Sequence, residues 1–193
     1  MVKVGFIVEG DTEKIILESD VFQNFIKKNK LDVIGIFNAG GKEKLISYNE
    51  KLNNFFKIFD DKLTQVIVII CDIENDPCIT FTKNSIYKYD ENKQIELVSV
   101  KAIESWFLAD SETFSKIFKK KYYFEFPENT KEKPFDVIKH EFLENTERGI
   151  SKSGNMLAKK MIKNGFSIEN AAKHNNCDSA KYFINKLKEI SNQ

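Results

Sequence analysis

Carboxylate side chains gather at two points of the chain, each directly after a short, largely apolar segment. The first group follows residues 2–8, and the second follows residues 66–71. The groups consist of Glu9, Asp11 and Glu13, and of Asp72, Glu74 and Asp76. Near-continuous apolar segments of this length are typical of buried parallel strands, whose carboxyl ends meet at the sheet edge where open α/β folds bind ligands. We therefore expect the two acidic groups to share one edge of a sheet.

Carboxylate oxygens are the ligands that hard divalent cations prefer. The sequence therefore predicts a Mg²⁺ or Mn²⁺ site, and the expected metal ligands are Glu9, Glu13, Asp72, Glu74 and Asp76. One or two such ions could activate a water molecule and stabilise the leaving oxygen of a phosphodiester. The alternative interpretation is that these carboxylates are solvated loop residues or helix caps. It suits Asp11 best, because Asp11 lies just before an expected helix with Thr12 as its cap.

The elements that would position these side chains alternate along the first part of the chain. Apolar runs predict strands, and apolar spacing of three and four residues predicts helices between them. The expected strands are 2–8, 32–37, 66–71 and 95–100, and the expected helices are 12–28, 42–59 and 83–89. This alternation predicts βαβ units with a parallel sheet, in which 66–71 is a central strand covered on both faces.

No strand is expected after residue 110, where only helical patterns follow. The predicted helices cover 114–118, 134–143, 155–162 and 179–190. We therefore predict an α/β protein with a Rossmann-like parallel sheet and a helical C-terminal extension. The expected division is an α/β domain at 1–110 and a helical region at 111–193 that packs on it.

Three motifs resemble one protein family when they are taken in order. They are Val8–Glu13 (Val-Glu-Gly-Asp-Thr-Glu), Asp72–Asp76 (Asp-Ile-Glu-Asn-Asp) and Ala102–Asp110 (Ala-Ile-Glu-Ser-Trp-Phe-Leu-Ala-Asp). The first two resemble the TOPRIM domain, which topoisomerases, primases and overcoming-lysogenization-defect (OLD) nucleases share. The third is similar to a motif of a small bacterial branch of TOPRIM-like proteins. The resemblance covers roughly the first 110 residues.

The resemblance implies a TOPRIM-like sheet, Mg²⁺ or Mn²⁺, and cleavage or transfer of phosphodiesters. Glu9 would be the family's first-strand glutamate, which acts as a ligand or as a general acid or base. Asp72 matches the first aspartate of the family's Asp-x-Asp pair. Glu74 replaces the second and reaches one methylene further, so Asp76 could share its role.

Two further residues follow elements that would bring them near the acidic edge. Glu104 comes soon after the fourth expected strand and is a candidate catalytic acid or metal ligand, while Trp106 next to it is expected to be a core residue. Lys152 lies in a Ser-Lys-Ser-Gly turn before a helix, where it could hold a phosphate with the backbone amides. OLD-type nucleases are similar in placing a lysine ahead of such a helix, which makes Lys152 a candidate catalytic residue. Asp110 is expected to cap the next helix.

Charge limits how a nucleic acid could be recognised. The chain carries 30 basic and 29 acidic residues, and Arg148 is its only arginine. Phosphate contacts would therefore depend on lysines and backbone amides, which does not favour sequence-specific recognition. Lys152, Lys159 and Lys160 are the candidate nucleic-acid-binding residues. The alternative for Lys159 and Lys160 is a solvated helix face.

Taken together, the sequence predicts a divalent-metal-dependent phosphodiesterase or nuclease that acts on DNA or RNA. The alternative is a non-catalytic accessory or nucleic-acid-binding subunit that works with an ABC/OLD-type ATPase, and analogy suggests a role in phage defence. A phosphatase acting on a small molecule is a third, less favoured alternative. No apolar run is long enough to span a bilayer, and the chain start does not resemble a signal peptide, so we expect a cytoplasmic protein without a membrane partner.

Overall fold

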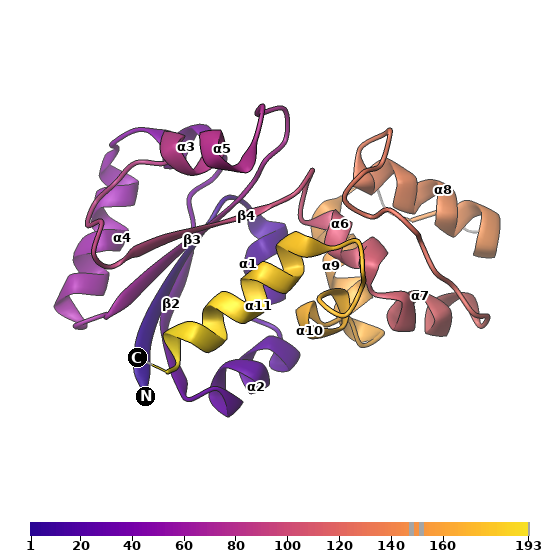
Figure 1. Cartoon of the computed structure of the whole chain (residues 1–193), viewed down its shortest axis with the longest axis horizontal. Coiled ribbons are helices and arrows are strands. Elements are labelled where there is room, and N and C mark those ends of the chain that lie inside the picture. Colours follow the sequence, from indigo (N-terminus) through magenta and orange to yellow (C-terminus); the bar gives the residue numbers. More distant parts are fainter. Residues whose placement is uncertain (147–148, 151–152, 193) are drawn as a thin grey trace.

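The protein folds around one four-stranded, all-parallel sheet. The computed structural model describes residues 1–146, 149–150 and 153–192. The strands are β1 (Val2–Val8), β2 (Leu31–Asn38), β3 (Val66–Asp72) and β4 (Gln94–Ser99), in the spatial order β2-β1-β3-β4 (Figure 1). Each lies within one residue of its predicted bounds. The predicted α/β fold with a Rossmann-like parallel sheet and C-terminal helices is confirmed.

Helices connect the strands and form most of the second half of the chain. Those between the strands and directly after β4 are α1 (Asp11–Leu17), α2 (Asp20–Lys28), α3 (Glu43–Ile46), α4 (Glu50–Asp61), α5 (Ile79–Ser85) and α6 (Glu104–Ala109). The others are α7 (Ser111–Phe118), α8 (Pro134–Thr146), α9 (Gly154–Lys163), α10 (Ile168–Ala171) and α11 (Asp178–Ile190).

Two of the long predicted helices are each divided in two. The expected helix 12–28 breaks before Ser19, whose hydroxyl accepts the Phe22 N–H at 3.3 Å and so begins α2. The expected helix 42–59 breaks before Asn49, whose side chain accepts the Leu52 N–H at 2.9 Å and begins α4. Both breaks follow from side chains that cap a new helix more readily than they continue an old one.

Two smaller predictions are also wrong. The helix expected at 83–89 lies earlier, at Ile79–Ser85, because the chain beyond it is held extended by the hydrogen bond from the Tyr87 N–H to the Leu45 carbonyl. Thr12 does not cap α1. Gly10 is the cap residue, and the Glu13 carboxylate accepts the Gly10 N–H at 3.1 Å.

The sheet is buried on both faces, as its apolar strands require. Along β3, the side chains of Val68 and Ile70 join a hydrophobic cluster with α1, α2, α6 and α11, while Ile67 and Ile69 join a second cluster with α4. On the α4 side, Gly5 of β1 permits close packing, since a Cβ there would lie 2.4 Å from the Phe59 ring. The interpretation of β3 as a doubly covered central strand is therefore confirmed.

The C-terminal helices return to the sheet. Figure 1 shows α11 lying across the face of the sheet, where Phe183 packs against Trp106 of α6 with ring centroids 5.2 Å apart. The first hydrophobic cluster contains side chains of β1, β3 and β4 together with side chains of α9, α10 and α11. The helical region thus shares its core with the sheet. Within the described residues, no helix combines the length and apolar character needed to cross a membrane.

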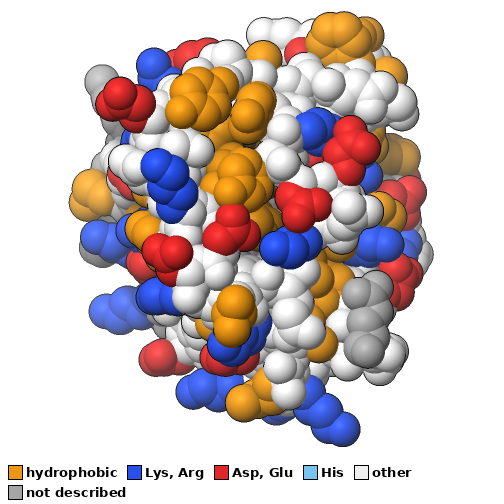
Figure 2. Space-filling model, turned by 90° about the vertical axis from the view of Figure 1, so that its left-hand side faces the viewer, with side chains coloured by type: hydrophobic (Ala, Val, Ile, Leu, Met, Phe, Trp, Pro, Cys, Tyr) orange, Lys and Arg blue, Asp and Glu red, His pale blue; other side chains and the backbone are white. Residues whose placement is uncertain are grey.

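The end of the molecule that carries α4 is shown in Figure 2. Basic, acidic and apolar side chains of the described residues are intermixed on this face. It therefore presents a surface of mixed charge, unlike the single-sign surface that attracts a polyanion.

Candidate functional site

The carboxyl ends of β1 and β3 bring the two acidic groups together. These strands are parallel neighbours, and the Glu9 N–H continues the ladder by donating to the Ile70 carbonyl at 3.0 Å. The Asp72 N–H in turn donates to Glu9 Oε2 at 3.1 Å. Glu9 and Asp72 therefore lie in contact at one edge of the sheet, as the sequence predicts.

Four carboxylates at this edge interact electrostatically. Burial, followed by repulsion from Glu13, raises the pKa of Glu9 to about 7. Burial and the neighbouring Glu104 raise the pKa of Glu13 to about 7. Burial raises the pKa of Asp72 well above its usual range, with Glu13 and Glu104 contributing, and burial with nearby Glu9 raises that of Glu104. Such mutual repulsion is costly to a fold and is typical of functional sites.

Hydrogen bonds fix the orientation of these side chains. The Ser99 hydroxyl at the end of β4 donates a short hydrogen bond to Asp72 Oδ1. The Glu13 carboxylate accepts the Gly10 N–H and also its own backbone N–H, and Glu13 is 5% exposed. Glu9, Glu13 and Asp72 each keep one carboxylate oxygen that the bonds to Asp72 N–H, Gly10 N–H and the Ser99 hydroxyl do not use.

The carboxylates do not form a ready-made cage for a cation. Among the residues that the structure describes, no group of three or more His, Cys, Asp or Glu side chains is placed to hold a metal ion. Mg²⁺, however, is commonly held by one or two carboxylates with several waters, so two oxygen ligands on one wall of a cavity suit it. Asp72 and Glu74 are two carboxylates that line the same cavity.

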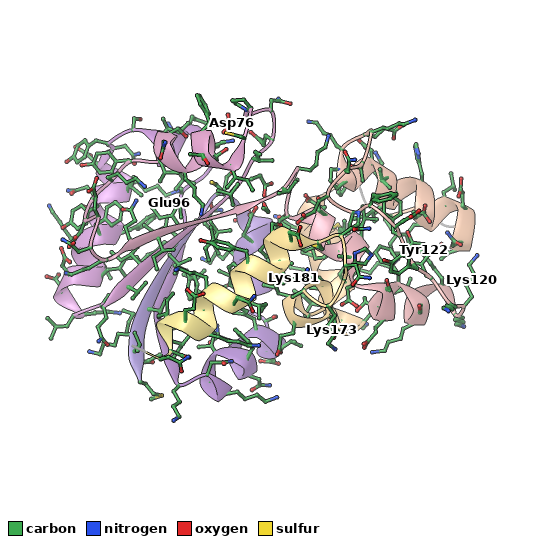
Figure 3. All side chains as sticks on the ribbon, viewed as in Figure 1. Asp76, Glu96, Lys120, Tyr122, Lys173 and Lys181 are labelled. Atoms are coloured by element: carbon green, nitrogen blue, oxygen red, sulfur yellow. The ribbon has the colours of Figure 1, made fainter. Side chains whose placement is uncertain are left out.

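Asp76 is separated from the other predicted ligands by its own partners. The Lys42 ammonium lies 2.7 Å from Asp76 Oδ2, and the Thr82 hydroxyl donates to the same oxygen at 2.7 Å. These two groups hold the pKa of Asp76 below its usual range. Figure 3 shows Asp76 in the loop that leads from β3 to α5. Asp76 therefore stabilises the loop between β3 and α5, residues 73–78, which we call the acidic loop.

Lys42 contacts this site and was not singled out from the sequence. It is 9% exposed, and Nζ also donates to the Asp72 and Ile73 carbonyls at 2.8 and 2.9 Å. The Gly40-Gly41-Lys42 turn was the available signal, but its resemblance to a phosphate-binding loop is incomplete. In the structure, this turn places the buried Lys42 ammonium against the backbone carbonyls at the carboxyl end of β3.

Glu74 lies at the entrance to the site. It is exposed and adopts a left-handed backbone conformation, with φ of 51°. Its N–H donates to the Lys101 carbonyl at 3.1 Å, which ties the loop after β3 to the loop after β4. Lys101, the partner of Glu74 in this hydrogen bond, also has a left-handed backbone conformation, with φ of 66°.

A cavity of about 380 Å³ opens beside these residues. It is lined by Asp72, Glu74 and Glu104 and by the chain that enters α8, where Glu132 adds a fourth acidic residue. Lys101, Lys131 and Lys133 also line it, and none of them was singled out from the sequence. We call this cavity the acidic cleft.

Comparison of the chain with protein-family models, with curated proteins and with solved structures found no match. The resemblance to TOPRIM proteins therefore stays a prediction from three motifs. The structure places the first at the end of β1 and the start of α1, the second directly after β3, and the third over α6. Within the third, Trp106 is a buried core residue, and Asp110 caps α7 by accepting the Thr113 N–H at 3.0 Å, both as predicted.

The first turn of α9 packs directly against this edge. A Cβ on Gly154 would lie 2.9 Å from Thr12 Oγ1 and 3.3 Å from Glu104 Oε1. Asn155 donates to Asp11 Oδ2 at 3.2 Å, so Asp11 links α1 to α9. The amino-terminal end of α9 therefore lies near Glu104, where its partial positive charge favours a carboxylate.

Three lysines were predicted to bind nucleic acid, and the structure describes two of them. Lys152 lies outside the described residues. Lys159 and Lys160 are exposed on α9, and Lys160 Nζ lies 4.2 Å from the centre of the Phe142 ring in α8. Both lysines lie more than one helical turn after Gly154, the residue of α9 that packs near Glu104. Their predicted contact with nucleic acid would therefore be peripheral to the carboxylates.

Proposed function

We propose that this protein is a divalent-metal-dependent phosphodiesterase that hydrolyses nucleic acid. The observation that carries the proposal is the contact between Glu9 and Asp72 at the carboxyl ends of adjacent parallel strands, beside a cleft lined by carboxylates and lysines. Such an edge is where open α/β sheets place their ligands. The raised pKa values of the carboxylates add the electrostatic character of a catalytic site.

Asp72 and Glu74 are the residues that would hold Mg²⁺ or Mn²⁺. Both line the acidic cleft, and both offer the hard oxygen atoms that these ions prefer. When bound, the ion supplies positive charge for the phosphodiester oxygens and lowers the pKa of a water molecule. Lys42 stabilises this arrangement from behind, through the carbonyl oxygen of Asp72.

Glu9 is suited to accept the proton of the attacking water. Its pKa of about 7 means that much of it is ionised near neutral pH and can still bind a proton there. The water oxygen forms a bond to phosphorus, and one phosphorus–oxygen ester bond breaks. Glu104, whose pKa is also raised, donates a proton to the leaving oxygen. Water is thus divided between the two products, and no oxidant or reductant is needed.

A cleavage assay tests the proposal. The purified protein is incubated with single-stranded and duplex DNA and RNA in the presence of Mn²⁺, Mg²⁺ or EDTA. We expect cleavage with the ions, none in EDTA, and a loss of at least about 100-fold in Glu9→Gln and Asp72→Asn, the usual order for a catalytic group. The matched control is Glu91→Gln, a change at an exposed residue, purified in parallel. Intact substrates with folded protein would contradict the proposal.

One observation favours a second function. The described residues contain no three-membered metal-binding group, and Asp76 is neutralised by Lys42. A site of this kind also suits a non-catalytic subunit that binds nucleic acid beside an ATPase partner, and a role in phage defence would follow by analogy. Binding of nucleic acid without cleavage in any ion would favour this function.

A further inference from the structure

One wall of the acidic cleft is formed by residues 131–135, which carry two lysines, an aromatic ring and one carboxylate, that of Glu132. Lys131, Lys133 and Phe135 come from the chain entering α8, and Lys101 comes from the loop after β4. Lys131 is exposed, and Phe135 is half-buried against the hydrophobic core. The cleft thus combines cations, an aromatic ring and carboxylates in one cavity.

This wall is held in place by short-range hydrogen bonds. The buried Thr130 donates its hydroxyl to the Glu132 carbonyl at 2.7 Å. The Lys133 carbonyl accepts the N–H groups of Asp136 and Val137 at 2.9 and 3.1 Å, and so begins α8. Phe135 is fixed by this turn, with Lys139 Nζ 5.5 Å from the centre of its ring.

The three lysines of the cleft are not committed to carboxylate side chains. In the described part of the chain, the ion pairs include none of Lys101, Lys131 and Lys133. Lys42, by contrast, is fully used by Asp76 and two carbonyls. Lys101, Lys131 and Lys133 are therefore the cations that remain for an anionic ligand at the cleft.

The size of the cleft limits what can enter it. A cavity of about 380 Å³ is at the lower end of the range for sites that bind one small molecule, about 300–1,000 Å³. One nucleotide fits such a volume, whereas a base-paired duplex does not. Binding of single strands without sequence preference typically combines cations along the backbone with an aromatic ring on which a base stacks.

We propose that the acidic cleft binds one nucleotide of an unpaired nucleic-acid strand, with its base against Phe135 and its flanking phosphates at Lys101 and Lys131. This inference rests on the proposed function, which places the phosphodiester to be cleaved at the carboxylates of the cleft. It goes further in naming the substrate class: single strands or frayed ends, and not intact duplex. DNA and RNA strands are both expected to bind.

Binding is measured apart from cleavage. Fluorescence anisotropy is recorded in EDTA with a labelled 12-nucleotide single strand, as DNA and as RNA, and with the same sequence as a blunt duplex. The variants are Lys101→Ala, Lys131→Ala and Phe135→Leu, and the control is Lys57→Ala. Lys57 is exposed on α4, which lies at the opposite end of the molecule from α8 (Figure 1). Melting temperatures verify that each variant is folded.

We expect the single strand to bind at least about 10-fold more tightly than the duplex, and Phe135→Leu to lower that affinity by about 10-fold, as for the loss of one stacked base. Lys101→Ala and Lys131→Ala should each reduce the slope of log affinity against log salt by about 0.7, the value for one phosphate of a single strand. Lys57→Ala should leave both quantities unchanged. If Phe135→Leu does not fold, Lys131→Ala, a change at an exposed residue, still tests the proposal.

The two proposals fail in different ways. Single-strand binding that depends on the cleft residues, without cleavage in Mn²⁺, would overturn the phosphodiesterase and keep this inference. Cleavage with equal affinity for duplex, or with the cleft variants equal to Lys57→Ala, would overturn this inference and keep the phosphodiesterase. Tight binding of a free mononucleotide with no gain from a longer strand, or no binding of any of these probes, would also overturn it.

Discussion

The Asp72 backbone N–H donates a hydrogen bond of 3.1 Å to the Glu9 carboxylate across 63 residues of sequence. The bond ties the residue after β1 to the last residue of β3. The two carboxylates are oriented by different groups. The backbone N–H of Asp72 orients Glu9, whereas the Ser99 hydroxyl orients the Asp72 side chain. The two carboxylates should therefore respond differently to substitution.

Metal binding and proton transfer should be separable by mutation. Asp72→Asn should abolish the increase in melting temperature that Mn²⁺ causes, because Asp72 is proposed to hold the ion. Glu9→Gln should keep most of that increase and still lose cleavage, because Glu9 is proposed to accept a proton. Differential scanning fluorimetry with and without Mn²⁺, next to the cleavage assay, measures both. Equal loss of the Mn²⁺ effect in the two variants would assign Glu9 to the metal instead.

The pH dependence of stability should reveal the crowded carboxylates. The pKa of Glu9 and of Glu13 rises from 4.5 to about 7 on folding, so the folded protein binds protons more tightly than the unfolded chain. Stability in metal-free buffer should therefore fall as pH rises from about 4.5 to about 7, and stay low above that range. With allowance for solvent screening, a loss of about 2 kcal/mol, or roughly 6 °C in melting temperature, is expected.

Neutralising one of these carboxylates provides the control. Glu9→Gln should flatten the pH profile and raise the melting temperature at pH 8, whereas Glu91→Gln should follow the wild type. A wild-type protein in EDTA whose melting temperature rises steadily between pH 5 and pH 7 would contradict the raised pKa values.

The strands could be predicted from the sequence because their signal is local. Runs such as Val66–Cys71 are apolar at every position, which is typical of a strand covered on both faces. The same feature placed Glu9 and Asp72 at the sheet edge, since a parallel sheet aligns its carboxyl ends. The positions of Ser19 and Asn49 as helix breaks were harder to predict, because each residue also fits a helix surface.

The rest of the site depends on contacts between distant segments. Lys42 and Asp76 are 34 positions apart, and only the packing of α3 beside the loop after β3 brings them together. Lys131 and Phe135 belong to a helical region whose pattern says nothing about which sheet edge it covers. Charge pattern alone therefore drew attention to Lys159 and Lys160 and missed the lysines that line the cleft.

Removing the buried cation should loosen the acidic loop. Lys42→Met keeps the length of the side chain but leaves the Asp72 and Ile73 carbonyls and the Asp76 carboxylate without their cation. Breaking a buried pair in this way costs about 3 kcal/mol, or roughly 10 °C in melting temperature. Thermal unfolding measures the effect, with Lys57→Met at an exposed position as the control. A Lys42→Met protein as stable as Lys57→Met would show that the acidic loop does not depend on Lys42.

The last prediction concerns the contact between α9 and the carboxylate edge. Gly154→Ala adds a Cβ that would lie 2.9 Å from Thr12 Oγ1 and 3.3 Å from Glu104 Oε1, so α9 must move away from both. Alanine favours helix more than glycine by about 1 kcal/mol, so a loss of activity or stability in this variant must come from the contact. We expect slower cleavage and a lower melting temperature.

A double-mutant cycle isolates that contact. Thr12→Ala removes the oxygen that the new Cβ meets first, so Thr12→Ala/Gly154→Ala should recover much of what Gly154→Ala loses, with a coupling of about 1 kcal/mol. Gly149→Ala is the matched control, because a Cβ at Gly149 meets nothing within 4 Å among the described atoms. Additive effects of the two substitutions would mean that α9 does not rest on Thr12, and that the carboxylate edge is shaped by the sheet alone.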